Sequence, residues 1–327
     1  MFMTTSTQYS HIPLISVVMP AFNAEKFIKQ AIDSMLAQTY PNWELLVADD
    51  ASTDNTRELV NAYSDPRIKT FHQDQNLGYP LTCNRLLSLA TGDYLTFLDS
   101  DDYTAPNRLE LLYSAFQLDP SLGMVGSAVQ LVSEEGILIR TDIKPQSYDE
   151  ILDAVNSINP FCGAALMVTR EVYNTIGGYR DFFLQLRYQD FDWSSRIIEK
   201  YKAINLPDPL YYYRQNPASN SKQLDPMHEV ALKAVRYLRD QRLTLGKDDL
   251  ELKNQTVLES KVEDWLIPYR VDTTLVHREA AGKFMYNKMY RQAIQISWKA
   301  VRQQPMRIIN WRTLAYCVRK SIFASNK

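Results

Sequence analysis

Residues 94–102 read YLTFLDSDD, and this stretch decides the fold because a short apolar run ends in three carboxylates. Tyr94–Leu98 has the pattern of a buried strand, and so do Leu14–Met19, Glu44–Ala48 and Ile68–Phe71. Helical patterns separate the four runs, which predicts a doubly wound α/β sheet. Ligands bind such sheets beyond the carboxyl ends of the strands, where the polar clusters of this chain lie.

The rest of the chain continues this pattern and then becomes helical. The further expected elements are a β-hairpin over residues 123–140 with its turn at Glu135-Gly136, a strand at Ala164–Thr169, a helix at Phe191–Tyr201, and helix caps at Asn55 and Thr104. The expected domains are a first domain over residues 1–224, with halves at about 14–120 and 121–224, and a helical C-terminal region over residues 225–327.

The composition excludes several classes of protein. The 327 residues carry 36 Lys and Arg against 38 Asp and Glu, so no basic excess points to nucleic acid. Cys83, Cys162 and Cys317 lie far apart without CxxC spacing, which argues against disulfides or a zinc site and favours the cytoplasm. No apolar leader or membrane-spanning run of roughly 18 residues is found. We expect a cytoplasmic protein without a transmembrane helix.

Asp99, Asp101 and Asp102 crowd the turn after the fourth expected strand. Like charges this close raise each other's pKa unless a cation neutralises them. Mg²⁺ or Mn²⁺ takes oxygen ligands and bridges phosphates, so this turn is a candidate site for a metal and a diphosphate. The alternative is a solvated acidic turn in which Asp102 caps the next helix.

Two further acidic clusters suit nucleotide binding and catalysis. DDASTD at 49–54 follows a strand, where a carboxylate can accept the N–H of a pyrimidine base; the alternative is a loop with ordinary capping residues. QDFDWSSR at 189–196 begins a helix, and Asp190 is a candidate general base for a hydroxyl proton. The alternatives are that Asp190 is an N-cap and that Asp192 and Arg196 form a helix-surface pair.

Taken in order, these clusters resemble family 2 of the inverting glycosyltransferases, of the type that assembles bacterial surface polysaccharides. The matching stretches are SVVMPAFN at 16–23, VADDASTD at 47–54, NLG at 76–78 with Asn84 downstream, TGDY at 91–94 running into FLDSDD at 97–102, and QDFDW at 189–193. The resemblance covers residues 14–220 and implies a GT-A fold, here a doubly wound mixed sheet with a helical C-terminal region. Gln189 replaces the family's frequent Glu, and Ala51 its usual Gly.

The resemblance also implies a role for each matching residue. It places Asp190 as the catalytic base and Asp99 and Asp101 as metal ligands for Mn²⁺ or Mg²⁺. The residues implied to bind the nucleotide-sugar donor, expected to be UDP-linked, are Pro20, Ala21, Phe22, Asn23, Asp49 or Asp50 on the base, Asn76, Gly78, Asn84, Asp99, Ser100 and, at the diphosphate, Arg214. The acceptor is expected to be a glycan or a lipid-linked hydroxyl. Residues 207–221, including Asn216, fall where relatives carry a loop over the diphosphate.

The C-terminal end of the chain is basic. Residues 278–327 hold eleven Lys or Arg and one acid, whereas residues 1–277 hold 25 bases and 37 acids. Apolar residues such as Trp311 and Leu314 interleave with these bases, as in a helix on an anionic membrane surface. The interpretation is peripheral association through residues 300–327 with the inner face of the plasma membrane. The alternative is a helix that packs its apolar side on the catalytic domain.

Two other functions remain as alternatives to sugar transfer. A non-catalytic protein could retain the fold for binding, although the presence of all three of Asp99, Asp101 and Asp190 argues against it. A nucleotidyltransferase would also use a metal and a nucleotide. It would need a glycine-rich, basic phosphate loop near the N-terminus, and residues 21–26 do not form one.

Overall fold

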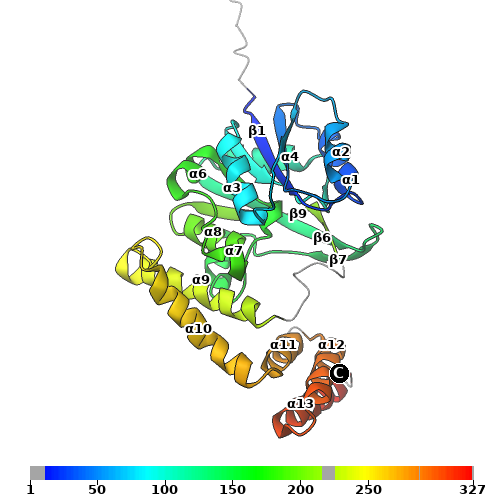
Figure 1. The fold of residues 1–327 in the computed structure, drawn as a ribbon, viewed down its shortest axis with the longest axis vertical. Helices are drawn as coiled ribbons and strands as arrows, with labels where there is room; N and C mark the ends of the chain where they lie inside the picture. The colour runs from blue at the N-terminus through cyan, green and yellow to red at the C-terminus, as the bar shows by residue number, and fades with distance from the viewer. Residues whose placement is uncertain (1–11, 216–224, 287, 326–327) are drawn as a thin grey trace, which may run out of the picture. The chain divides into compact units, whose positions relative to one another are not determined.

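The computed structural model describes residues 12–215, 225–286 and 288–325 of the chain, with side chains to residue 322. The chain divides into two compact units, Met1–Pro217 and Ala218–Lys327. Figure 1 shows a sheet with helices in the first unit and helices in the second. Each unit is described by itself.

The first unit is built on a mixed sheet of nine strands among the described residues. The strands in sheet order are β3 (Ile68–His72), β2 (Trp43–Asp49), β1 (Ile15–Ala21), β4 (Tyr94–Phe97), β8 (Met167–Thr169), β6 (Leu122–Val132), β9 (Lys202–Arg214) and β5 (Tyr103–Thr104), with β7 (Leu138–Asp142) paired to β6. The first four are parallel, whereas β8 is antiparallel to β4 and β6. The sequence-based expectation of an α/β sheet is therefore confirmed.

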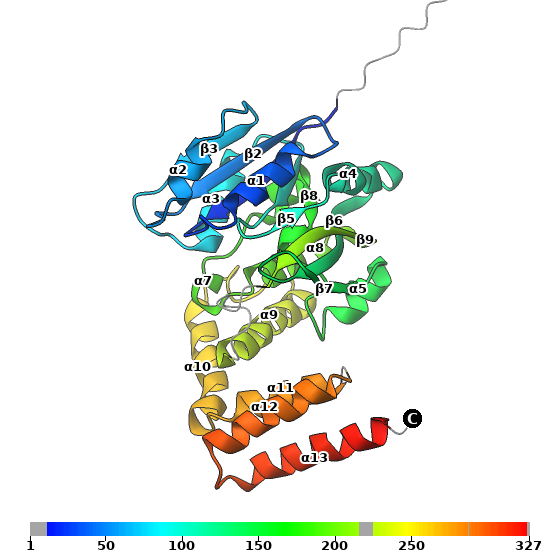
Figure 2. The same cartoon turned by 90° about the vertical axis from the view of Figure 1, so that its right-hand side faces the viewer.

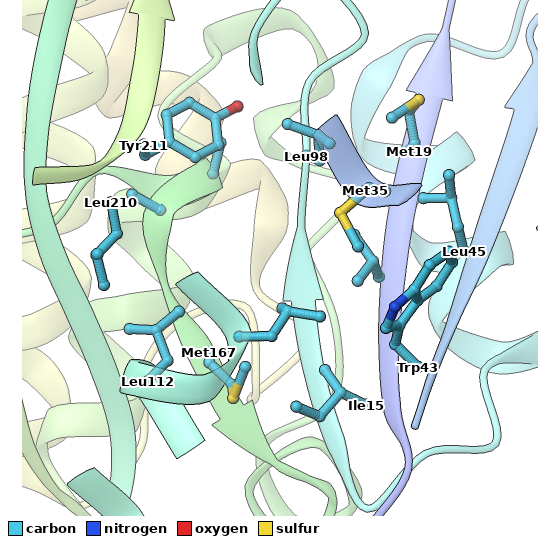
Figure 3. Packing of buried hydrophobic residues seen from close by; sticks show 14 of the residues in the cluster. Ile15, Met19, Met35, Trp43, Leu45, Leu98, Leu112, Met167, Leu210 and Tyr211 are labelled. Carbon is cyan, nitrogen blue, oxygen red and sulfur yellow. The ribbon is translucent and has the colours of Figure 1, made fainter. Parts of the chain in front are cut away.

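Helices cover both faces of this sheet. The helices of the first unit are α1 (Ile28–Leu36), α2 (Thr56–Asn61), α3 (Tyr79–Leu89), α4 (Arg108–Leu118), α5 (Tyr148–Ala154), α6 (Arg170–Ile176), α7 (Phe183–Leu186) and α8 (Gln189–Ile198), with a short 3₁₀ turn at Gly163–Ala165. One core cluster joins α1, α2 and α4 to alternate residues of β1 and β2, and Figure 3 shows Ile15, Met35 and Trp43 within it. The α3 helix contacts β1 and β2 but adds no residue to that cluster, so it lies on the opposite face (Figure 1).

Three local expectations are wrong. Two are helix caps, whose side chains bond to residues of other elements instead, and the third is the start of a strand. The α4 helix begins at Arg108 after Asn107, while Thr104 lies in β5 and accepts a hydrogen bond from Gln38 Nε2 at 3.0 Å. Asn55 does precede α2, but its side chain donates to Glu25 Oε2 at 2.8 Å instead of accepting from the helix. The expected strand at Ala164–Thr169 begins only at Met167.

A buried carboxylate joins β1, β2 and the turn before β4. Glu44 accepts hydrogen bonds from Ser16 Oγ at 2.6 Å, from Thr91 N at 2.8 Å and from Lys69 Nζ at 2.5 Å. A Cβ at Gly92 would lie 2.6 Å from Leu14 O, so only glycine fits where this turn meets β1. Burial alone would raise the pKa of Glu44, but the hydrogen bonds outweigh it and lower the pKa to about 2.

The second unit contains helices alone in the part that the structure describes. They are α9 (Pro226–Leu245), α10 (Gln255–Val271), α11 (Leu275–Tyr286), α12 (Tyr290–Gln303) and α13 (Ile308–Ser325). Asp225 caps α9 by accepting from Met227 N, and Gly246 ends it with φ of 78°. Among all described residues, no helix combines the length and apolarity needed to cross a membrane.

We expect Glu44→Gln to destabilise the fold in a pH-dependent way. Because the folded pKa of about 2 lies below the ordinary 4.5, the ionised carboxylate stabilises the fold above pH 4.5, and this contribution is lost as pH falls toward 2. Its size at neutral pH is on the order of 3 kcal/mol. Urea unfolding at pH 7, 5 and 4 measures the free energy of unfolding of the unchanged chain and of Glu44→Gln. The difference between them should be smallest at pH 4. Exposed Glu58→Gln is the control, and a gap independent of pH would contradict the assignment.

Candidate active site

The carboxyl ends of the parallel strands bring the polar clusters to one edge of the sheet. In the aligned register, Ala21 at the end of β1 pairs with Asp49 at the end of β2, and Val18 of β1 pairs with Phe97 of β4. The turn at Asp99 therefore follows β4 beside the loops after β1 and β2. This is the edge at which open α/β sheets bind ligands.

Asp99 is held by tyrosines from distant parts of the chain. Tyr79 of α3 donates its Oη proton to Asp99 Oδ1 at 2.7 Å, and the Asp99 backbone N–H donates to Tyr211 Oη at 3.0 Å. Burial and the neighbouring charge of Asp101 together raise the pKa of Asp99 to about 7. The carboxylate therefore lies where negative charge is costly and a cation would be stabilised.

Asp101 and Asp102 complete the acidic turn, with Ser100 between them and Asp99. Burial raises the pKa of Asp101, and burial together with Asp101 and Asp99 raises that of Asp102. Asp102 accepts the backbone N–H of Arg214 at 2.6 Å, and it is buried. The alternative of a solvated turn in which Asp102 caps a helix is wrong, because Asp102 instead ties the turn to β9.

The acidic turn fits a divalent cation that is completed by a second molecule. Within the described residues no group of three or more His, Cys, Asp or Glu side chains is arranged to hold a metal ion. Burial nevertheless raises the cost of ionising both Asp99 and Asp101, the charge of Asp101 adds to that cost at Asp99, and a nearby cation would relieve it. Mg²⁺ in phosphate sites is commonly bound by one or two carboxylates plus phosphates and water, so the pair suits a metal that arrives with a diphosphate.

The loops after β1 and β2 are tied together by Asn23. Its Oδ1 accepts from Thr53 N at 2.9 Å, and Ser52 Oγ accepts from Asn23 N at 3.0 Å. Asn23 itself has φ of 49°, a left-handed conformation that Asn tolerates better than most residues. Pro20 and Ala21 are buried in β1, whereas Phe22 projects from the same turn with 49% of its surface exposed. The Phe22 ring is therefore accessible to a ligand at this turn.

The structure separates the two carboxylates at the end of β2. Asp50 accepts from Leu77 N at 2.8 Å and Gly78 N at 2.9 Å, which shapes the loop before α3. Asp49 accepts from Arg57 Nε at 3.0 Å and lies beside a polar hollow of about 560 Å³. The hollow is lined by Ala51, Ser52, Thr53, Asp54, Arg57, Glu58, Gln73 and Asp74. Both side chains build the loops around this hollow.

Asp190 stands in the first turn of α8, which begins at Gln189 after Tyr188. Asn159 Nδ2 donates to Asp190 Oδ2 at 3.0 Å. A Cβ at Gly163 would lie 2.6 Å from Asp190 Cβ, so glycine leaves the room that the aspartate occupies. Arg187 and Tyr188 both have φ of 62°, which turns the chain sharply into the helix. Asp190 is not the N-cap of α8, so that alternative is wrong.

Burial raises the pKa of Asp190 above its ordinary value, and hydrogen bonds from backbone groups and from Asn159 oppose the rise. A partly buried carboxylate with a raised pKa is better matched to taking a proton near neutral pH than an ordinary surface aspartate. Its position and its pKa therefore suit a general base.

The α8 helix is fixed by a buried ion pair. Asp192 is fully buried and accepts from Arg180 Nε at 2.9 Å and from Arg196 Nε at 3.0 Å. The expectation of a helix-surface pair is wrong, since both ends of the pair are enclosed. Trp193 adds a hydrogen bond from Nε1 to Gly177 O at 2.7 Å. These contacts hold the helix that carries Asp190.

The other residues named by the resemblance differ in their burial and in their hydrogen-bond partners. Arg214 is buried, and its guanidinium donates to Asp101 O at 2.8 Å, to Glu134 O and to Gln30 Oε1 at 2.6 Å. Asn84 exchanges hydrogen bonds with the backbone of Tyr179. Asn76 is exposed, and Gly78 has φ of 86°. Asn216 and the rest of 216–221 lie outside the described residues.

The sequence analysis missed the polar partners of the acidic groups. Tyr79 and Asn159 donate to the carboxylates of Asp99 and Asp190, Tyr211 accepts from the Asp99 backbone, and Gly163 leaves room for Asp190; each lies more than 15 positions from the aspartate it meets. The one available signal was the tyrosine run at 211–213, which the sequence analysis did not connect with Asp99.

Comparisons with known sequences show which family the chain resembles. Residues 16–177 match glycosyl transferase family 2. The chain is 33% identical over 208 residues, 62% of its length and 74% of the other's, to "Putative glycosyltransferase EpsE" of Bacillus subtilis. It is 38% identical over 141 residues, 42% of its length and 55% of the other's, to "UDP-Glc:alpha-D-GlcNAc-diphosphoundecaprenol beta-1,3-glucosyltransferase WfgD" of Escherichia coli.

Two solved structures share the fold. Residues 1–349 of S. aureus TarS, in complex with UDP-GlcNAc, match with a TM-score of 0.58 and 18% identity over 94% of this chain and 88% of that one. The mannosyltransferase PcManGT from Pyrobaculum calidifontis, in complex with GDP-Man and Mn²⁺, matches with a TM-score of 0.54 and 18% identity over 96% and 88%. At this identity the likeness shows the fold alone, and it confirms the expected GT-A fold.

We expect Asp192→Asn to destabilise the first unit strongly. The change leaves the Arg180 and Arg196 guanidinium groups without their buried counter-charge, which costs about 3–5 kcal/mol in comparable sites. Urea unfolding at pH 7 measures the loss. Exposed Asp181→Asn is the matched control, and equal stability of the two variants would show that the pair contributes nothing to the fold.

Proposed function

The chain belongs to glycosyl transferase family 2, and from this premise we propose that it transfers a sugar from a UDP-sugar to a hydroxyl of a glycan or lipid-linked acceptor. The observation that carries the proposal is the placement of Asp190 and the acidic turn at Asp99–Asp101 on one α/β scaffold. Relatives named as glycosyltransferases favour this activity over a nucleotidyltransferase. The presence of all three carboxylates favours an enzyme over a non-catalytic binding protein.

The nucleotide is proposed to lie against the loops after β1 and β2. Phe22 offers an exposed aromatic face for a base, and the polar hollow beside Asp49 offers hydrogen-bonding groups. WfgD carries UDP-Glc in its name, and the TarS structure contains UDP-GlcNAc, which supports a UDP-linked donor here. Arg57 pairs with Asp49 in this structure, so base binding to Asp49 would require Arg57 to move or share the carboxylate.

The donor diphosphate is proposed to lie at the acidic turn with Mn²⁺ or Mg²⁺. Asp99 and Asp101 would hold the cation, and the Mn²⁺ in the PcManGT structure supports this choice. Such a cation would offset the charge of the diphosphate as it leaves. The acidic turn has the wrong sign to bind phosphate alone, so a metal explains why carboxylates stand there.

Asp190 is proposed to act as the general base of a single displacement. As the acceptor oxygen forms a bond to the anomeric carbon, the bond from that carbon to the diphosphate oxygen breaks and UDP leaves. The acceptor proton passes to Asp190 Oδ, and Asn159 keeps that carboxylate oriented. Attack opposite to the leaving group inverts the anomeric centre without a covalent enzyme intermediate.

We expect UDP to bind the purified protein more tightly with Mn²⁺ than without it. Asp101→Ala should reduce the metal-dependent part of the affinity by at least tenfold, because one of two metal-holding carboxylates is lost. Isothermal titration of UDP with and without Mn²⁺ measures this. Exposed Asp93→Ala is the control, although its link to Leu14 makes a check of thermal stability necessary. Unchanged affinity of Asp101→Ala would remove Asp101 from the metal site.

We expect Asn159→Ala to move the acid limb of the transfer rate to higher pH. Asp190 works only when ionised, so kcat/KM falls as pH drops through its pKa. Loss of the Asn159 hydrogen bond, of the order of 1.5–3 kcal/mol to a charged group, should raise that pKa by about 1–2 units. The pH profile of UDP release measures the shift.

Two further variants belong to the same experiment, one that removes the proposed base and one that serves as a control. Asp190→Asn should abolish transfer while leaving UDP binding intact, and exposed Asn107→Ala should leave the profile unmoved. A rate that falls by the same factor at every pH in Asn159→Ala would mean that Asn159 supports the fold and not the charge of Asp190.

A further inference from the structure

The last helix of the chain presents an apolar stripe to solvent. Ile308, Trp311, Ala315, Val318 and Ile322 follow one another at spacings of three and four residues, which places them on one side of α13. All five are exposed, and Ile308 and Ile322 keep 69% and 57% of their surface accessible. An open groove of about 610 Å³ runs along this side, lined by Trp311, Leu314, Ala315, Val318, Arg319 and Ile322. We call this side the outer face of α13.

Most of the outer face takes no part in packing α13 on its neighbours. Figure 2 shows α13 beside α12 and α11, and the buried contacts of α13 lie on a different side, while Trp311 at the edge of the outer face also touches Trp298 of α12. Asn310 is fully buried there and donates to Ala300 O at 3.0 Å, while Cys317 packs with Ala293 and Ile296. The apolar stripe therefore remains in addition to a completed helix packing, as expected of a surface that meets another apolar phase.

Positive charge surrounds the outer face. Residues 278–327 hold eleven Lys or Arg against one acid. The exposed bases on α12 and α13 include Lys299, Arg302, Arg312, Arg319 and Lys320. Of the ion pairs that the described residues form, none includes any of these five. The charge is free to meet an anionic partner.

Two tryptophans mark the boundary between the apolar stripe and the bases. Trp298 of α12 and Trp311 of α13 lie with ring centroids 5.9 Å apart in an edge-on arrangement, and each keeps close to half of its surface exposed. Trp residues concentrate at the headgroup level of bilayers, where one end of the ring is apolar and the other is wet. Long Arg and Lys side chains beside them can reach the headgroups while their stems cover apolar surface.

We propose that α12 and α13 bind the chain to an anionic lipid bilayer, with the outer face of α13 at the headgroup and acyl boundary. A second copy of the chain fits this surface poorly, since two regions each carrying eleven bases and one acid would repel. The combination of Ile, Val and Trp with unpaired bases matches an interfacial helix. The binding does not rest on the proposed donor or acceptor. If the acceptor is lipid-linked, the same contact would keep the enzyme at the surface that displays it.

The test is flotation of the full chain with vesicles, in the absence of donor and acceptor. We expect the protein to float with vesicles of 30% phosphatidylglycerol in phosphatidylcholine at 100 mM NaCl and to remain behind with pure phosphatidylcholine. Raising the salt to 500 mM should release most of the protein, because screening weakens attraction between exposed charges.

Two multiple-substitution variants, each with a matched control, separate the apolar contribution to vesicle binding from the charged one. Trp311→Ser with Ile322→Ser should lower the bound fraction at least tenfold, and so should Arg312→Gln with Arg319→Gln and Lys320→Gln. The matched controls change exposed residues of the same kind elsewhere, Leu245→Ser with Val271→Ser and Lys29→Gln with Arg85→Gln and Lys200→Gln. These controls should bind vesicles like the unchanged chain, and unchanged circular dichroism confirms that each variant is folded.

Three results would overturn the proposal. The first is no flotation of the unchanged chain with anionic vesicles. The second is equal flotation of the outer-face variants and their controls. The third is light scattering that shows a dimer which Trp311→Ser with Ile322→Ser dissolves in the absence of lipid, since a second copy would then be the occupant of this face.

Discussion

The first unit depends on holding three carboxylates in one partly buried turn. Asp99, Asp101 and Asp102 cannot all ionise there without compensation, and separate elements each supply part of it. Tyr79 comes from α3, Tyr211 and the backbone of Arg214 from β9. The turn after β4 thus adds contacts with α3 and β9 to the direct pairing of β4 with β8.

A buried cation lies beneath the same turn. Arg108 of α4 is fully enclosed and donates to Thr96 Oγ1 at 2.7 Å and to Ala164 O at 2.9 Å. Burial lowers its pKa to about 10, and the charge of Asp99 opposes that fall. The guanidinium therefore joins β4 to the 3₁₀ turn that precedes β8 while offsetting negative charge above it. Arg108 therefore contributes both to packing and to charge balance.

What the sequence could predict follows from the range of the interactions involved. The parallel strands and the acidic turn were predictable, because apolar runs and adjacent carboxylates are local features. The caps at Asn55 and Thr104 were not, because Glu25 and Gln38 compete for those side chains from other elements. The sequence could not show that backbone amides of the loop at 77–78 occupy Asp50, because that loop lies 27 and 28 positions away. The i, i+4 spacing of Asp192 and Arg196 predicted a surface pair, because the spacing carries no information about Arg180, which also binds the buried Asp192.

The two left-handed residues before α8 have a consequence for how the enzyme responds to heat. Arg187 and Tyr188 each hold a positive φ that costs a residue with a side chain about 1–3 kcal/mol, and neither is glycine. Trp193 and the Asp192 pair, which hold the helix, help to offset that cost. On warming, this turn is a natural place for the chain to relax first, which would carry Asp190 away from Gly163 while the sheet remains intact. Turnover should then fade at temperatures where the protein still looks folded, and the loss should reverse on cooling.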